Sequence, residues 1–238
     1  MKKTVISLLA VIAFTLSGLA QKTIKDANVQ VREAKDFHAI SVSNAFDVYL
    51  TQGDEEKVAV SAGNEKHLAN IKVEVKNGVL YIGWENKDRK LRIGNNKLKA
   101  YISFKKIDKL NVSGACDVKI VGELTADDLK VNLSGASDLE GKITARNLKI
   151  DMSGASDVKI NGVASNLKLD LSGACSFKGF DFAANNCIVD ASGASDVKLT
   201  VNEELTVDVS GASDVAYKGT GSVTKVKSSG SSSVKRVS

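Results

Sequence analysis

The stretch Ser192-Gly193-Ala194-Ser195-Asp196-Val197-Lys198-Leu199 decides the fold, because the chain repeats it. Close copies begin at Ser113, Ser134, Ser153, Ser172 and Ser210, and a degenerate copy begins at Ser229. The spacings between these opening serines are 21, 19, 19, 20, 18 and 19 residues. A nearly fixed period of this length is typical of a solenoid, in which each repeat buries its apolar face against its neighbours.

Apolar and polar residues alternate on both sides of each copy. Leu148, Ile150 and Met152 precede Ser153, and Val158 and Ile160 follow it. Such alternation indicates short strands with one buried face, and the absence of a 3.6-residue period excludes helical solenoids. We therefore expect an all-β, single-stranded parallel β-helix, with two strands and a shorter third strand in each coil. Equivalent residues then form columns with a rise of ~4.8 Å per coil.

The Ser-Gly-Ala part of the phrase lies between two strands and is predicted to be a corner, since glycine adopts the left-handed conformation of a sharp bend at little cost. The segment Ser43-Asn44-Ala45-Phe46-Asp47-Val48-Tyr49-Leu50 has the same frame. Asn44 stands where the later copies have glycine, and asparagine also tolerates the left-handed region. We expect one β-helix domain over residues 28–238, with irregular coils at 28–110 and regular coils at 111–238.

Three segments of the irregular part carry more specific expectations. Residues 58–63 resemble another corner, and residues 73–82 read as two strands around an Asn77-Gly78 turn. Residues 85–97 are rich in charge and predict an exposed excursion.

The first 20 residues have the features of a cleaved signal peptide. Lys2 and Lys3 form a basic start, residues 4–16 are uncharged and largely apolar, and small residues precede Gln21. The apolar run is short for a membrane span of ~20 residues, so an uncleaved anchor is the less favoured alternative. We expect an exported protein in the periplasm, on the outer-membrane surface or secreted. It would have a short extension at residues 21–27 and no transmembrane anchor after cleavage.

The distribution of charge bears on the class of partner, and the spacing of the cysteines bears on disulfides. Residues 21–238 contain 31 basic and 28 acidic residues that are interspersed, so a concentrated basic face for nucleic acid is not predicted. Cys116 and Cys175 hold the same repeat position three coils apart, roughly 14 Å, which exceeds the ~7 Å limit between Cα atoms of a disulfide. Cys187 falls in a leucine column and should be buried. The last coil, residues 227–234, is polar and is expected to cap the solenoid only weakly. Association of several copies of the chain is therefore an open alternative.

One column of acidic residues is the sharpest candidate for chemistry. Its members are Asp117, Asp138, Asp157, Asp196 and Asp214, with Asp47 as an earlier member and serines at 176 and 233. A calcium ladder is one interpretation, because carboxylates are ligands that calcium prefers. The favoured interpretation is that each aspartate accepts hydrogen bonds from amides at its own corner, while nearby lysines reduce repulsion. No metal, cofactor or catalytic residue is predicted, since the only histidines, His38 and His67, lie outside the regular repeats.

Aromatic residues mark two places where the repeat breaks. One coil loses the aspartate and gains Phe177, Phe180 and Phe182. The favoured interpretation packs them into the coil, and the alternative makes Phe180 and Phe182 a contact for a partner. Tyr81 and Trp84, beside the charged excursion, are a second candidate contact surface.

The opening Phe37-x-x-Ile40-x-Val42, the segment 47–53 and the later Leu-x-Val-x-Leu-Ser-Gly-Ala-Ser-Asp-Val repeats together resemble the putative auto-transporter adhesin, head GIN domain family. The resemblance covers residues 30–235. It implies a right-handed parallel β-helix, related in shape to pectin lyases, in a bacterial cell-envelope protein of unknown function.

Two functions follow as expectations. The first is a non-catalytic binding module, an adhesin for a cell-surface glycan or an envelope protein. The second is a polysaccharide-active, pectin-lyase-like enzyme, which would ordinarily need a clustered acid and base in loops that break the repeat. The short, uniform coils favour the binding module.

Overall fold

The computed structural model describes Asp26, residues 28–85 and residues 97–238. The predicted signal peptide (1–20), most of the extension at 21–27 and most of the charged excursion lie outside the described residues. The elements are β1 (Val29–Arg32), β2 (Ala39–Val42), β3 (Phe46–Gln52), β4 (Lys57–Ser61), the 3-10 helix η1 (Glu65–Asn70), β5 (Ile71–Lys76), β6 (Val79–Trp84), β7 (Leu98–Phe104), β8 (Lys109–Gly114), β9 (Asp117–Gly135), β10 (Asp138–Gly154), β11 (Asp157–Gly173), β12 (Ser176–Gly193), β13 (Asp196–Val209), β14 (Asp214–Lys218), β15 (Ser222–Ser228) and β16 (Ser233–Arg236).

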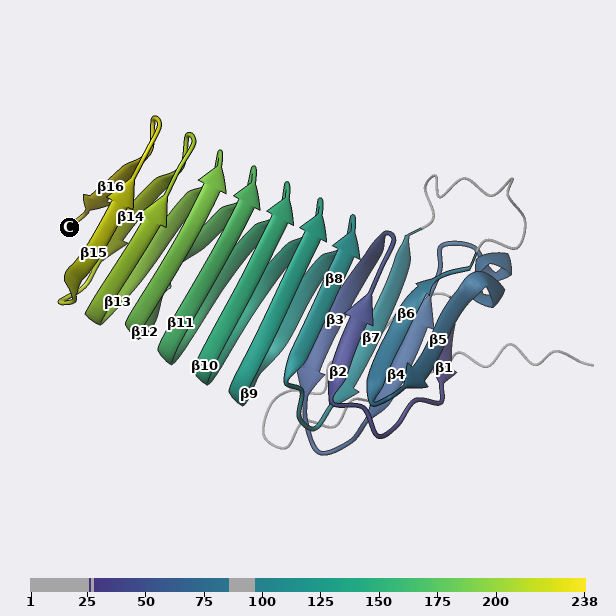
Figure 1. Cartoon of the computed structure of the whole chain (residues 1–238). Helices are drawn as coiled ribbons and strands as arrows, with labels where there is room; N and C mark the ends of the chain where they lie inside the picture. The colour runs from purple at the N-terminus through teal and green to yellow at the C-terminus, as the bar shows by residue number, and fades with distance from the viewer. Residues whose placement is uncertain (1–25, 27, 86–96) are drawn as a thin grey trace, which may run out of the picture.

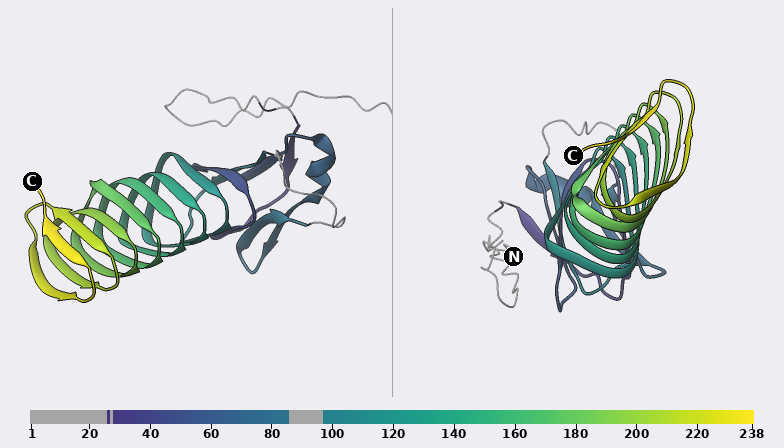
Figure 2. Two further views of the ribbon diagram at one scale, coloured as in Figure 1. Left: turned by 90° about the horizontal axis from the view of Figure 1, so that it is seen from above. Right: turned by 90° about the vertical axis from the view of Figure 1, so that its left-hand side faces the viewer.

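The regular coils form a parallel β-solenoid, as predicted. Strands β9 to β13 each pair in parallel with the next, and the coils stack along one axis from the amino-terminal region to the carboxyl terminus (Figures 1 and 2). The separate strands expected in each coil join into one long strand, which bends at glycines such as Gly122 and Gly162, where the ladder between coils shifts register.

The corners are where the repeated phrase was expected to place them. Each phrase glycine lies in the left-handed region, with φ between 74° and 107°; they are Gly114, Gly135, Gly154, Gly173, Gly193, Gly211 and Gly230. The following residue donates its backbone N–H to the carbonyl of the preceding corner, as Ala194 does to Gly173 at 2.8 Å. Asn44 has φ 83° and accepts from Ala115 N–H at 2.6 Å, so it is the same corner in the amino-terminal region.

The spatial order of the first coils differs from the chain order. Strands β2 and β3 pair in parallel with β8 and β9 on one side, with Asp47 opposite Asp117. On their other side they pair in parallel with β6 and β7, which come later in the chain. Residues 53–108 therefore leave the solenoid after β3 and build its outer end before β8 resumes the stack. Irregular coils were expected over residues 28–110, and the irregularity takes the form of a spatial order that departs from the chain order.

Antiparallel strands cover the amino-terminal end. β4 pairs with β7 and β1 pairs with β4, while β5 pairs with β6. Residues 58–63 are therefore no corner, because Val58–Ser61 belong to the straight strand β4. The Asn77-Gly78 turn is confirmed, with φ of 50° and 72° at its two residues.

Inward-facing side chains of all coils form one continuous apolar core. Cys116, Cys175 and Cys187 are buried and unpaired. Cys187 lies in register between Leu167 and Leu205, as its place in the repeat predicted. In the part of the chain that the structure describes, no helix is long and apolar enough to cross a membrane.

Candidate binding face

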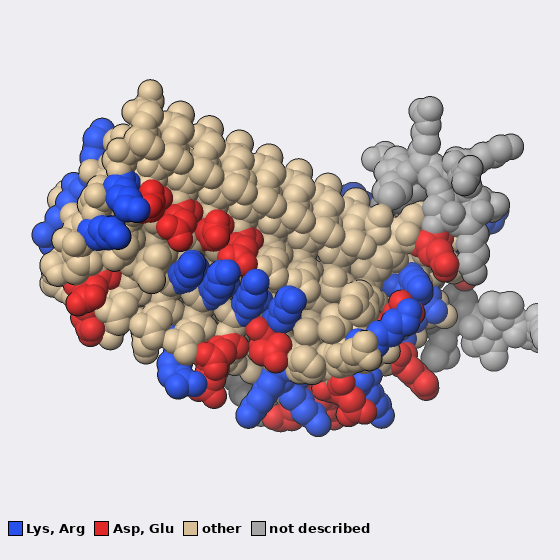
Figure 3. All heavy atoms as spheres, in the orientation of Figure 1, with Lys and Arg blue, Asp and Glu red and all other residues tan. Residues whose placement is uncertain are grey.

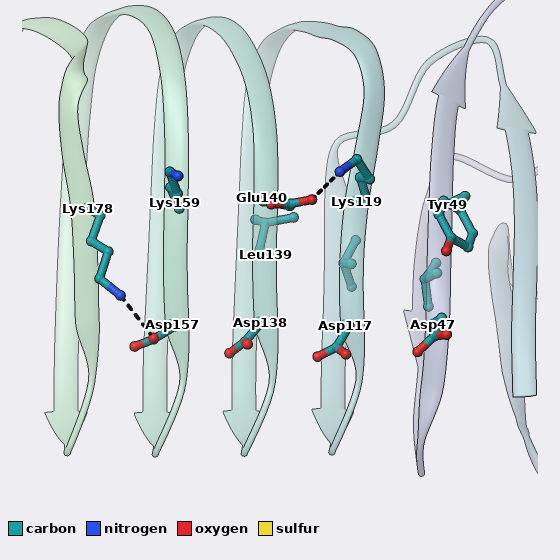
Figure 4. A pocket seen from close by; sticks show the side chains of 12 residues that line it. Asp47, Tyr49, Asp117, Lys119, Asp138, Leu139, Glu140, Asp157, Lys159 and Lys178 are labelled. Atoms are coloured by element: carbon teal, nitrogen blue, oxygen red, sulfur yellow. Dashed lines mark hydrogen bonds and ion pairs between the residues drawn. The ribbon is translucent and has the colours of Figure 1, made fainter. Parts of the chain in front are cut away.

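The aspartate column is real and lies on one outer face of the solenoid. The parallel register places its members opposite one another on successive coils, in the order Asp47, Asp117, Asp138, Asp157, Ser176, Asp196 and Asp214. Alternation explains the orientation, since the next residue in each strand, such as Val118 or Leu139, is buried. We call this surface, from β3 to β14, the aspartate face (Figure 4).

A second column runs beside the aspartates, two residues further along each strand. It contains Tyr49, Lys119, Glu140, Lys159, Lys178 and Lys198. The lysines pair both along and across the columns: Lys119 contacts Glu140, and Lys178 lies 3.2 Å from Asp157 (Figure 4). Lys198 lies 3.3 Å from Asp196. The predicted relief of acidic repulsion by lysine is therefore visible in the ion pairs.

The two columns line a shallow groove of about 500 Å³ that crosses successive coils from β3 to β12. A second hollow of about 390 Å³ continues it toward Phe180. Lys119, Glu140, Lys159 and Lys178 line both, so the two form one surface. The aspartate face can thus offer hydrogen-bond donors and acceptors at each coil, repeated at ~4.8 Å.

The charges of this face perturb one another. Partial burial and then the carboxylates of Asp157 and Asp117 raise the pKa of Asp138 above its ordinary value. The hydrogen bond from Lys119 and its charge lower the pKa of Glu140. Asp138 lies between two aspartates of the column, Asp117 and Asp157, and both carboxylates act on its pKa.

Buried side chains just before the aspartate column also bond to the corners. Ser137 Oγ donates to Ser134 O, and Ser195 Oγ donates to Ser192 O, both at 3.1 Å. Cys175 Sγ makes the equivalent contact to Ser172 O at 3.5 Å. A hydrogen bond from the backbone of Asp157 lowers the pKa of Asp138, against the larger effects that raise it. That a corner amide bonds to each aspartate stays a prediction for the rest of the column.

The metal interpretation requires a cluster of ligating side chains. In residues 26, 28–85 and 97–238, no group of three or more His, Cys, Asp or Glu side chains is arranged to hold a metal ion. The calcium ladder of Asp117, Asp138, Asp157, Asp196 and Asp214 stays a prediction for titration. His38 contacts Asp108 at 3.1 Å, and the His67 ring packs edge-on against Trp84.

The four aromatic candidates separate into three situations. Phe182 is 0% exposed in the core, in register with Gly162; its ring is not available to a partner, which corrects that interpretation. Phe180 is half-buried, and the ammonium of Lys218 lies 5.2 Å from its ring centroid. Tyr81, 41% exposed, and the half-buried Trp84 line a hollow of about 270 Å³ beside Asn44.

Sequence reasoning missed a second charged surface. Figure 3 shows a row of acidic side chains beside a row of basic ones across the coils. The register identifies the acidic row as Asp151, Asp170, Asp190 and Asp208, and the basic row as Lys109, Lys130, Lys149 and Lys168. Asn147, Asn166 and Asn186 form a hydrogen-bonded ladder nearby. Aligning the polar positions of the Leu-x-Val-x-Leu segments would have found these columns.

The fold and this face define a class: a parallel β-solenoid that presents columns of repeated polar groups on its faces. Residues 36–221 match the family described as putative auto-transporter adhesin, head GIN domain, and the chain belongs to that family. The resemblance inferred from the sequence is thus confirmed. No curated protein matches the chain.

Solved structures are similar over most of the chain. A putative adhesin from Bacteroides fragilis is 25% identical, with a TM-score of 0.78 over 88% of this chain and 96% of the other. A putative lipid binding protein from Parabacteroides distasonis is 19% identical, with a TM-score of 0.67 over 90% of this chain and 98% of the other. A putative adhesin from Parabacteroides distasonis is 18% identical, with a TM-score of 0.70 over 88% and 96%. The last two likenesses concern the fold alone.

Proposed function

We propose that this protein is a non-catalytic binding module of the cell envelope, which holds a cell-surface glycan or an envelope protein along the aspartate face. The observation that carries the proposal is the groove itself, which runs across successive coils and presents outward polar groups, most of them aspartate and lysine, at each one. An extended polymer meets equivalent contacts at every coil, whereas a small substrate would use one. Membership of an adhesin family and likeness to a putative adhesin support the same conclusion.

The proposed location is outside the cytoplasm: periplasm, outer-membrane surface or secreted. It rests on the signal-peptide pattern of residues 1–20 and on the adhesin family. Fractionation of the native host, with detection of the mature amino terminus at Gln21, tests it. Recovery of the uncleaved chain in the cytoplasm contradicts it.

A glycan array with residues 21–238 tests the binding proposal most broadly. We expect a subset of glycans to bind, with affinity lowered when Lys159 and Lys178 are both changed to glutamate, since these exposed side chains line both hollows. Changing Lys35 and Lys66 to glutamate is the matched control, because both side chains are exposed at the other end of the protein. Equal loss in both double variants, or no binding to glycans or to envelope proteins, overturns the proposal.

An enzyme remains the second candidate because Asp138 has a raised pKa beside two other carboxyl groups. Glycoside hydrolases use a carboxylic acid with a raised pKa together with a second carboxylate. The outcome that favours this candidate is turnover of a polysaccharide by the purified protein that disappears in Asp138→Asn.

A further inference from the structure

The last coil of the solenoid has open strand edges. β15 pairs with β13, and β16 pairs with β14. Among the described residues no other strand pairs with either of them, so one side of each strand presents its backbone N–H and C=O groups to solvent. An exposed edge of this kind is a template for pairing with a further strand. The other end of the molecule is covered by antiparallel strands, so the two ends differ (Figure 1).

The apolar core is also open at this end. Val226 belongs to the column formed by Val131, Ile150, Leu169, Val189 and Val207. Each of those five is 0% exposed, whereas Val226 is 48% exposed. The difference arises because every other member has a coil on both sides. One more strand with an inward apolar residue would bury Val226 as its column predicts.

The charge of the last coil has a single sign. Residues 215–238 contain five basic residues, Lys218, Lys225, Lys227, Lys235 and Arg236, and no acidic residue. Lys225 and Lys227 lie on the exposed side of β15. Where lysines of this protein form ion pairs between coils, the partner is an acid of the adjacent coil: Lys227 lies 3.4 Å from Asp208, and Lys178 lies 3.2 Å from Asp157. A further strand that continued this rule would carry acidic outward residues.

A second copy of the chain does not satisfy this rule. Two carboxyl-terminal coils would bring lysines against lysines. The edge strands at the other end, β1 and β5, carry Arg32, Lys72 and Lys76 against a single acid, Glu74, so a head-to-tail contact also joins two basic edges. The occupant must therefore come from a chain with acidic residues.

We propose that the coil formed by β15 and β16 is an open docking site for an acidic, extended segment of a partner protein, which adds as the next strand of the solenoid. Backbone hydrogen bonds along the edge supply affinity, as in other cases of strand addition. Inward apolar residues cover Val226, and outward acids face Lys225 and Lys227. This surface is separate from the aspartate face, so the two proposals stand or fall independently.

The probe is a dye-labelled peptide of the seven-residue length of β15, with valine and glutamate alternating. A peptide with valine and lysine is its counterpart. Fluorescence anisotropy with the full chain is expected to show saturable binding of the glutamate peptide alone. Changing Lys225 and Lys227 together to glutamate should weaken that binding by about tenfold, since two cross-strand pairs become repulsive, and should create binding of the lysine peptide. Amide hydrogen exchange should show new protection in β15 when the glutamate peptide is bound.

The control is the double change Lys35→Glu and Lys66→Glu, which alters net charge equally in the amino-terminal region and should leave peptide binding unchanged. Three outcomes overturn the proposal: equal binding of both peptides, absence of glutamate-peptide binding at millimolar concentration, or loss in the control. Sedimentation that shows a dimer broken by the Lys225 and Lys227 changes would assign this end to a second copy instead.

Discussion

The regular coils and the amino-terminal region build the same corner in two ways. In the regular coils the left-handed residue is glycine, and an added Cβ at Gly193 would lie 2.5 Å from the carbonyl oxygen of Gly173. In the amino-terminal region the residue is Asn44, whose side chain accepts the backbone N–H of Trp84 at 2.8 Å. The missing side chain at Gly83 of β6 leaves space beside Asn44, since an added Cβ there would lie 3.4 Å from Asn44 Oδ1.

This difference shows what the repeat controls. Within the regular coils a residue's surroundings are set by its column, so the neighbours at one repeat away predict its environment. In the amino-terminal region the surroundings are set by antiparallel strands and a departure from chain order. The effect of a substitution on stability should therefore be predictable from the column of the residue in the regular coils. In the amino-terminal region it should depend on the contacts of the individual residue.

Among the side-chain truncations, the largest loss of stability is expected at Phe182, a column residue. Phe182→Ala removes a fully buried ring and should lower the free energy of unfolding by about 3–5 kcal/mol. Phe180→Ala, in the same coil but half-buried, should lower it by about 1 kcal/mol. Equilibrium denaturation by urea measures both. Equal losses would contradict the assignment of Phe182 alone to the core.

The cysteines give a sharper comparison of two columns. Cys187→Ser places a hydroxyl among leucines and should lower the free energy of unfolding by about 1–3 kcal/mol. Cys175→Ser should be nearly neutral, because serines at the same position in other coils bond to their own corner carbonyl. The same denaturation experiment checks both variants. An unchanged free energy of unfolding for Cys187→Ser would show that the hydroxyl finds water or another polar partner in this column.

Asn44 tests the other region. Asn44→Gly keeps the left-handed corner but removes the hydrogen bond from Trp84 N–H, so the free energy of unfolding should fall by about 1 kcal/mol. Hydrogen exchange at the Trp84 amide should accelerate. An unchanged Trp84 amide would show that Asn44 serves only as a corner residue.

The smallest change in stability is expected on the aspartate face, and there the substitution should stabilise the protein. Because the pKa of Asp138 is raised in the folded protein, its ionised form destabilises the fold at neutral pH, and protonation removes that effect. Asp138→Asn should therefore stabilise the protein by under about 1 kcal/mol at pH 7. The gain should vanish as pH falls below about 4. Denaturation at both pH values is the measurement, and a destabilised variant at pH 7 would contradict the assigned repulsion.

The repeat predicted much of this architecture, including the corner at Asn44 and the columns of Asp117, Asp138 and Cys187. It could not predict that β2 lies between β6 and β8 or that β3 lies between β7 and β9, because parallel pairing over a long separation leaves no local pattern. The antiparallel strand β4 was mistaken for a corner since Val58-Ala59-Val60-Ser61-Ala62-Gly63 imitates the phrase. The phrase alone did not show that Ser137 and Ser195, the buried serines just before the aspartates, also bond to the corner carbonyls.

The central claim is that the repeated phrase is a corner whose glycine is required by contact with the preceding corner. Gly193→Ala and Gly122→Ala test it most directly, since φ is 83° and 87°, yet an added Cβ at Gly122 would meet no atom within 4 Å. Each loses about 1–2 kcal/mol for the left-handed conformation, and Gly193→Ala should lose several kcal/mol more because backbone must move. Equal free energies of unfolding for the two variants would contradict the claim.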